Sequence, residues 1–191
     1  MSKQTYISTL LKLFRQFGYE GVTLSKISQE TGLGKASLYH HFPGGKAKMA
    51  EAALSDVNRL LETNILQPLA DATVEIENDV TLAIDAFESM CEKTSDFFNH
   101  GENSCLLAVL GMEESSNNLF QAQIRDTFTH WIEAIANVLI AAGLDEKLAR
   151  QRGEDAIIAI EGALILSHSL GDSSLFQRVI KELPQQICQD L

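Results

Sequence analysis

The chain has 191 residues, of which 45% are apolar, so it can form one compact domain and a smaller one with a packed core. Its three cysteines are an odd number without a C-x-x-C pair, which excludes a disulfide-built secreted domain and fits a reducing cytoplasm. No secretory signal opens the chain and no apolar run reaches membrane-spanning length, so we expect a cytoplasmic protein with no membrane partner.

The formal net charge of −11 is unevenly distributed. Residues 1–48 contain seven Lys or Arg and two acidic residues, a net of +5, whereas residues 49–191 contain eight basic and 24 acidic residues, a net of −16. A basic head can meet phosphate, and an acidic body is repelled from it. We therefore divide the chain into a head, residues 1–48, and a body, residues 49–191.

Three helices are predicted in the head. The first covers residues 3–18, where apolar residues recur at steps of three and four, and Gly18 ends it. The second is capped by the Thr23 hydroxyl and stops at Thr31-Gly32, because glycine tolerates a left-handed turn. The third covers residues 35–41. Two short helices joined by a tight turn are typical of a helix that lies in a DNA major groove.

The third helix has one apolar and one polar face. Leu38 and Phe42, four residues apart, should point inward. Lysine, serine, tyrosine and histidine donate hydrogen bonds to phosphates and base edges, and alanine can contact a thymine methyl group. The alternative is an ordinary helical hairpin with a solvated polar face. The residues predicted on the exposed face are Lys35, Ala36, Ser37, Tyr39 and His40.

The body is predicted to be helical throughout, which makes the fold all-α. A helix over 46–67 ends at Pro68 and should be the only covalent and mechanical link between head and body. Further helices are expected over 74–99, 105–112, 119–142, 145–170 and 173–189, with a polar loop at 113–118 and a kink or split at Pro184.

The predicted helix over 145–170 is nearly all apolar from Ala156 to Leu166. A helix that is apolar on every side must be buried on every side. We therefore expect one side to pack on its own core and the other on a second subunit, as a four-helix homodimer interface. The small residues predicted to permit close approach are Ala156, Ala159, Gly162, Ala163 and Ser167. The alternative is a monomer with one buried core helix.

The body has the composition of a ligand receptor. Its aromatic and sulfur-containing side chains can enclose an apolar or aromatic effector, although such a stripe can also be plain core. Glu161 is polar within an apolar segment and needs a partner there. Cys105 opens a short helix and is either a reactive thiol or a packing residue. The predicted ligand-binding residues are Phe87, Met90, Cys91, Cys105, Phe128, Trp131 and Glu161.

We expect no enzyme activity, because no catalytic set can be named. The chain contains no phosphate-cradling glycine loop, no G-x-S-x-G and no H-E-x-x-H. Its five histidines are scattered, so neither a metal site nor a cofactor is expected.

The head resembles the DNA-binding domain of the tetracycline-repressor (TetR) family over roughly the first 48 residues. The resemblance rests on the T-G-L-G of Thr31–Gly34 and the L-Y-H-H-F of Leu38–Phe42. It departs from the usual pattern at Gly34, where the family has Ser or Thr, and at Pro43-Gly44-Gly45, which adds one residue before Lys46. That F-P-G-G-K form is similar to the LmrA/YxaF-type branch.

The resemblance implies a homodimeric bacterial repressor that a small ligand releases from a palindromic double-stranded DNA operator. It also implies a phosphate contact from either Lys46 or Lys48, and the extra residue leaves both open. The alternative is a redox- or electrophile-sensing regulator that acts through Cys105. The predicted DNA-binding residues are Thr23, Ser25, Lys35, Ala36, Ser37, Tyr39, His40, Lys46 and Lys48.

Overall fold

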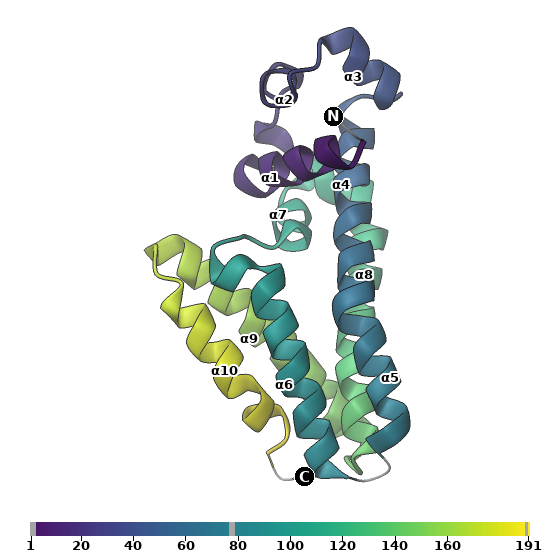
Figure 1. The fold of residues 1–191 in the computed structure, drawn as a ribbon, viewed down its shortest axis with the longest axis vertical. Helices are drawn as coiled ribbons and strands as arrows, with labels where there is room; N and C mark the ends of the chain where they lie inside the picture. Colours follow the sequence, from purple (N-terminus) through teal and green to yellow (C-terminus); the bar gives the residue numbers. More distant parts are fainter. Residues whose placement is uncertain (1–2, 77–78, 190) are drawn as a thin grey trace. The chain divides into compact units, whose positions relative to one another are not determined.

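The computed structural model describes residues 3–76, 79–189 and 191. Every regular element within these residues is a helix, which confirms the predicted all-α fold (Figure 1). The chain forms two compact units that alternate along the sequence. Unit 1 comprises Met1–Arg59 and Cys105–Ile124, and unit 2 comprises Leu60–Ser104 and Arg125–Leu191. The division into a DNA-binding head and a ligand-binding body at residue 48 concerns function and stays a prediction.

Unit 1 is built around a small apolar core to which each of its first helices contributes. The largest side chains in this core are completely or almost completely buried because the helices turn their apolar stripes toward one another. Among them are Leu10, Phe14, Ile27, Leu38 and Met49. Its elements are α1 (Lys3–Gly21), α2 (Leu24–Thr31), α3 (Lys35–His41), most of α4 (Lys46–Leu61), α7 (Leu106–Met112) and the beginning of α8 (Glu114–Ala141).

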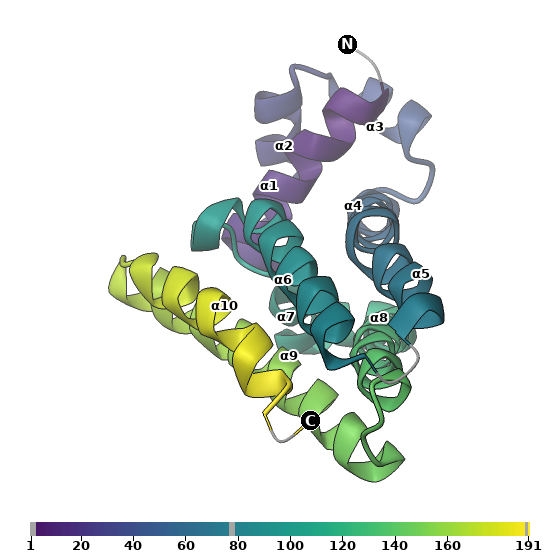
Figure 2. The ribbon, with the colours of Figure 1, turned by 60° about the horizontal axis from the view of Figure 1, so that its bottom comes forward.

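Unit 2 packs long helices side by side. Figure 2 shows α6 between α5 and α10, and α10 also packs against α9. Phe98 and Phe176 meet edge to face with ring centroids 6.1 Å apart, and Trp131 is completely buried. The elements are η1 (Glu62–Leu66), α5 (Gln67–Ile76), α6 (Val80–Phe97), η2 (Asn99–Gly101), the rest of α8, α9 (Glu146–Leu170) and α10 (Ser174–Ile187).

The predicted stop at Pro68 is wrong. α4 ends at Leu61, a π turn follows, and Pro68 is the second residue of α5. The backbone stays helical through the π turn, where the Gln67 N–H donates to the Glu62 carbonyl, so the chain continues as a helix into the proline. The following helix was also predicted too early, because α6 begins only at Val80, where the Asp79 carboxylate accepts from the Thr81 and Leu82 amides.

The predicted polar loop at 113–118 is instead the entry into α8, which begins at Glu114. This stretch has no glycine or proline to stop a helix. The Ser116 hydroxyl also donates to the Leu110 carbonyl at 2.7 Å, which ties the first turn of α8 to the end of α7. Tertiary contacts of this kind override a polar composition.

Pro184 does not split the last helix, since α10 continues through it to Ile187. It lies in the last turn, where it removes only one helical N–H donor. The Ser173 side chain makes no capping hydrogen bond, although the residue stands at the capping position as predicted.

α4 is not the only mechanical link of the head, contrary to the prediction. α1 packs against α7 within unit 1. The chain also passes between the two units three times, after Arg59, after Ser104 and after Ile124. The last passage lies inside α8, so this one helix contributes to both units.

Candidate nucleic-acid interface

α2 and α3 form the predicted pair of short helices, and local side-chain contacts define both ends of the turn. The Thr23 hydroxyl accepts from the Lys26 amide at 3.1 Å, which caps α2. Gly32 has a φ of +69°, the left-handed conformation that ends the helix. The Ser28 hydroxyl donates to the Leu33 carbonyl at 2.6 Å and holds the turn closed. Gly34 begins α3 without a side-chain cap, as its lack of a hydroxyl requires.

The two faces of α3 lie as the sequence predicts. Leu38 and Phe42 are buried in the core of unit 1, at 1% and 4% exposed. The Tyr39 side chain is 50% exposed. The predicted face residues Lys35, Ala36, Ser37, Tyr39 and His40 are all exposed. A row of hydrogen-bond donors on a short exposed helix can reach phosphates and base edges.

Three predicted DNA-binding residues from different elements meet around one hollow of about 450 Å³. Thr23 comes from the start of α2, Tyr39 from α3 and Lys46 from the start of α4. Gly44 and Gly45 contribute backbone to the same hollow. Ser25 is exposed on α2 and does not line it.

Lys46 and Lys48 have different surroundings. The Lys46 ammonium donates to the Tyr19 carbonyl at 2.8 Å and lies 4.2 Å from the centroid of the Tyr19 ring. Lys48 lies beside a separate hollow of about 280 Å³ and forms an ion pair with Glu51 at 2.5 Å. Because an ammonium group has three N–H donors, Lys46 can keep its Tyr19 contact and still donate to a phosphate.

Tyr19 is a residue of this region that the sequence analysis missed. Its ring packs between Phe14 and Phe120, with centroids 6.2 Å and 6.1 Å away. Burial raises the pKa of its phenol. The sequence signal was Gly18, which was predicted to end the first helix. Gly18 does interrupt the helix, with a φ of +66°, but α1 then resumes and runs to Gly21.

The predicted ligand-binding residues are divided between the two units. Phe87, Met90, Cys91 and Trp131 are buried in unit 2, Phe128 is half-buried, and both carboxylate oxygens of Glu161 are buried. Cys105 is buried in unit 1 instead. Burial raises the pKa of the Cys91 thiol to about 12, and the charge of Glu88 adds to that shift.

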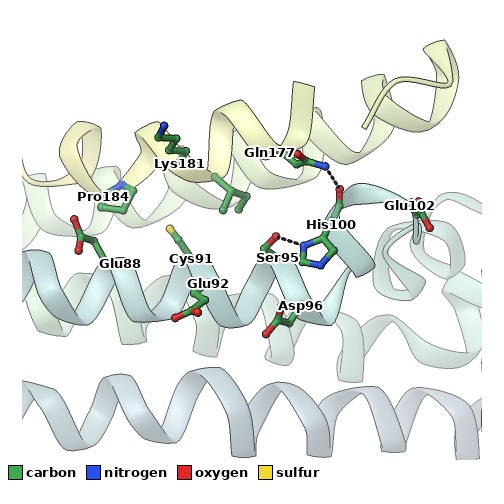
Figure 3. Close-up of a pocket in the computed structure, with 11 residues that line it drawn as sticks. Glu88, Cys91, Glu92, Ser95, Asp96, His100, Glu102, Gln177, Lys181 and Pro184 are labelled. Atoms are coloured by element: carbon green, nitrogen blue, oxygen red, sulfur yellow. Dashed lines mark hydrogen bonds between the residues drawn. The ribbon is translucent and has the colours of Figure 1, made fainter. Parts of the chain in front are cut away.

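A groove of about 770 Å³ lies between α6 and α10 in unit 2 (Figure 3). Cys91 is the predicted ligand-binding residue that lines it. The His100 ring and the Ser95 hydroxyl are hydrogen-bonded at 3.0 Å, and the Gln177 amide donates to the His100 carbonyl at 3.5 Å. The lining is mainly polar and acidic, unlike the aromatic pocket that the sequence predicts, and includes Glu88, Glu92, Asp96 and Glu102.

The capped helix, the glycine turn and the exposed donors of α3 place the protein in the class of helix-turn-helix DNA-binding regulators. Residues 7–53 match the family described as bacterial regulatory proteins, tetR family. Residues 83–182 match the LmrA/YxaF-like C-terminal domain of transcriptional regulators. The chain therefore belongs to the TetR family of bacterial transcriptional regulators, in its LmrA/YxaF-like branch.

Two regulators of Bacillus subtilis are similar over nearly the whole chain. The HTH-type transcriptional regulator LmrA is 28% identical over 189 residues, which is 96% of this chain and 95% of LmrA. The uncharacterized HTH-type transcriptional regulator YxaF is 27% identical over 187 residues, which is 96% of this chain and 93% of YxaF.

A solved structure of a TetR transcriptional regulator from Legionella pneumophila has the same fold. It superimposes with a TM-score of 0.76 at 21% identity and covers 97% of both chains. Within the residues that the structure describes, no helix is long and apolar enough to cross a membrane.

Proposed function

We propose that the protein is a ligand-responsive repressor that binds a palindromic operator as a homodimer through α3. The observation that carries the proposal is the exposed row of Lys35, Ser37, Tyr39 and His40 on a helix whose other face is buried. Tyr39 and Lys46 line one hollow with Thr23, a set of donors suited to a backbone phosphate. A cytoplasmic location follows from this function, because bacterial DNA lies there. Catalysis has no part in it.

The homodimer is supported by an unpartnered apolar face on α9. Ile158, Ile165, Leu166 and Leu170 are between 48% and 69% exposed in the single chain. A Cβ added at Gly162, on the same helix, would meet open space, so a second helix can approach closely there. Of the small residues predicted at this contact, Ala156, Ala163 and Ser167 are instead buried in their own unit. The exposed face is therefore made mainly of large apolar side chains.

The dimer would place two copies of α3 in successive major grooves, about 34–36 Å apart on the operator. A small hydrophobic or aromatic effector that binds unit 2 would change that separation and weaken the complex. A typical coupling free energy of about 1–3 kcal/mol corresponds to a loss of roughly 5- to 150-fold in affinity.

The interior of unit 2 supports an effector site beside Trp131. Its indole N–H and the Thr94 hydroxyl are buried, and neither has a hydrogen-bond partner within the part of the chain that the structure describes. A buried polar group without a partner typically costs about 1–3 kcal/mol, so a ligand with a hydrogen-bonding group would gain from meeting it. By contrast, a redox sensor at Cys105 needs an accessible thiol, and Cys105 is 4% exposed.

The DNA-binding proposal is tested by selecting bound fragments from a pool of random duplex DNA. We expect a near-palindromic sequence whose binding weakens steeply as salt rises. Tyr39→Ala and Lys46→Ala should each abolish that binding with unchanged helix content by circular dichroism. Lys181→Ala on α10 is the control for Lys46→Ala, because it removes the same positive charge but from unit 2. Normal binding by both head variants would contradict the site.

The effector proposal is tested by a thermal-shift screen of aromatic and cationic compounds. Because Trp131 is the only tryptophan, its fluorescence reports directly on the proposed site. A compound that raises the melting temperature should change that emission and release the selected duplex. A stabilising compound that binds Trp131→Phe with full affinity would place the effector elsewhere.

A further inference from the structure

The break in α1 exposes a backbone amide that helix hydrogen bonds would otherwise use. Gly18 has φ +66° and ψ −179°, a non-helical conformation that interrupts the helix between its two parts. The N–H of the next residue, Tyr19, therefore turns away from the helical ladder. It donates instead to the Glu113 carboxylate, with the amide nitrogen 2.6 Å from Oε2.

Glu113 fits closely against this break. A Cβ at Gly18 would overlap Oε1 of Glu113, so only glycine leaves room for the carboxylate. The Ser116 hydroxyl also lies 3.2 Å from Oε2, although its single proton has a shorter contact with the Leu110 carbonyl at 2.7 Å. Ser115 adds a second contact between the two segments, because its hydroxyl donates to Oε1 of Glu20 at 2.8 Å. These two hydrogen bonds join segments of unit 1 that lie 94 and 95 residues apart in the sequence.

Tyr19 is held from its other end by Lys46. The Tyr19 carbonyl accepts from the Lys46 ammonium at 2.8 Å, so one residue joins a carboxylate through its N–H and an ammonium through its C=O. Lys46 is the first residue of α4 and follows Gly45. A Cβ at Gly45 would lie 3.3 Å from Cε1 of Tyr39, so the Tyr39 ring of α3 packs directly on this glycine.

We propose that Glu113 is a positioning residue for DNA binding that acts through Tyr19 and Lys46 on Tyr39. Its carboxylate fixes the Tyr19 backbone, which fixes Lys46 at the rim of the hollow that Thr23 and Tyr39 also line. Glu113 immediately precedes α8, the helix that contributes to both units and carries Trp131. A shift of the start of α8 would therefore move this carboxylate. The inference rests on the proposed DNA-binding function.

The matched pair Glu113→Gln and Glu114→Gln tests this role. Both changes remove one negative charge at neighbouring positions, and Glu114 is exposed in the first turn of α8. Electrostatics alone predicts that either change strengthens binding to DNA slightly, because a repelling charge is lost. Positioning predicts the opposite sign for Glu113→Gln alone, a loss of a few-fold, because the Gln amide oxygen accepts from the Tyr19 N–H more weakly than a carboxylate does.

The measurements are affinity for the duplex that the wild-type protein selects, melting temperature, and amide hydrogen exchange at Tyr19 by NMR. We expect Glu113→Gln to speed exchange at the Tyr19 amide and weaken binding, while Glu114→Gln changes neither. Glu113→Asp keeps the charge but draws the carboxylate back from the Tyr19 N–H by one methylene, and should also weaken binding. It also serves if Glu113→Gln does not fold.

The outcomes separate the two proposals. If the wild-type protein selects no duplex, the proposed function fails. If the wild-type protein binds its duplex and the folded Glu113→Gln and Glu113→Asp variants bind it equally well, the positioning role is wrong while the function stands. Weaker binding with an unchanged Tyr19 exchange rate would also overturn the path through Tyr19.

Discussion

The proposed dimer face of α9 makes the sharpest quantitative prediction. Ile158 is 68% exposed in the single chain, the second highest value on that face after Leu170 at 69%. In a twofold-symmetric dimer each substitution acts twice. We expect Ile158→Glu to dissociate the dimer while leaving each subunit folded, because the side chain contributes little to the core of its own unit.

The size of the effect follows from the exposed fraction. Burying a whole isoleucine side chain contributes about 1.5–3 kcal/mol, so burying the two-thirds that remain exposed contributes roughly 1–2 kcal/mol per subunit. Two copies give about 2–4 kcal/mol, or a rise of roughly 30- to 700-fold in the dimer dissociation constant. Desolvation of the two introduced carboxylates adds to this value.

Sedimentation velocity over a concentration series measures the dissociation constant directly. Leu82→Glu on α6 is the matched control, because Leu82 is also apolar and 40% exposed but lies on another helix. A dissociation constant for Ile158→Glu equal to that of the wild type would refute the interface. So would a Leu82→Glu protein that dissociates to the same extent.

Three further predictions concern the head and the thiols. Lys35→Ala should weaken binding to all duplex sequences by a similar factor and lower the salt slope by about 1 in titrations at several salt concentrations; an unchanged slope would exclude a phosphate contact. Gly32→Ala should lower the free energy of unfolding in urea by about 1 kcal/mol, because its φ of +69° disfavours a Cβ, and Gly32→Asn should lose less. The raised pKa of Cys91, about 12 against the usual 9.0, means that above pH 9 the unfolded thiol loses a proton that the folded one keeps. Stability should therefore be complete below pH 9 and fall by up to about 1.4 kcal/mol per pH unit above it, and Cys91→Ala should remove that part of the slope; an equal slope in both proteins would contradict the shift.

The helix-turn-helix was predictable because its signals are local. Thr23, Gly32 and the burial of Leu38 depend on residues within one or two turns, and all three lie as the sequence predicts. Pro68 and the polar run at 113–118 were misread for the opposite reason. A π turn before the proline and the bond from Ser116 to Leu110 are consequences of packing that composition does not encode.

The same distinction applies to the candidate site. The exposed face of α3 follows from helical periodicity, so the sequence predicts which side chains it presents. The two contacts that hold the Tyr19 backbone do not follow from periodicity. Their partners, Lys46 and Glu113, lie 27 and 94 residues away in the sequence. A break at Gly18 can be read from the sequence, but not which carboxylate fills it.

Charge explains why the specific contacts of α3 must matter so much. Several cations of the basic head already have partners within the protein: Lys26 lies 3.1 Å from the centroid of the Phe17 ring, Lys46 binds Tyr19, and Lys48 pairs with Glu51. Each phosphate contact contributes about 0.9 to the salt slope, and the net charge of −11 weakens the attraction to arbitrary DNA. Under the proposed function, most discrimination between an operator and other DNA would come from base-edge contacts, for which Ser37 and His40 are the candidates. Such binding is strong only when the side chains of α3 are held in fixed positions toward the bases. The contacts of Tyr19 with Glu113 and Lys46 would provide that positioning.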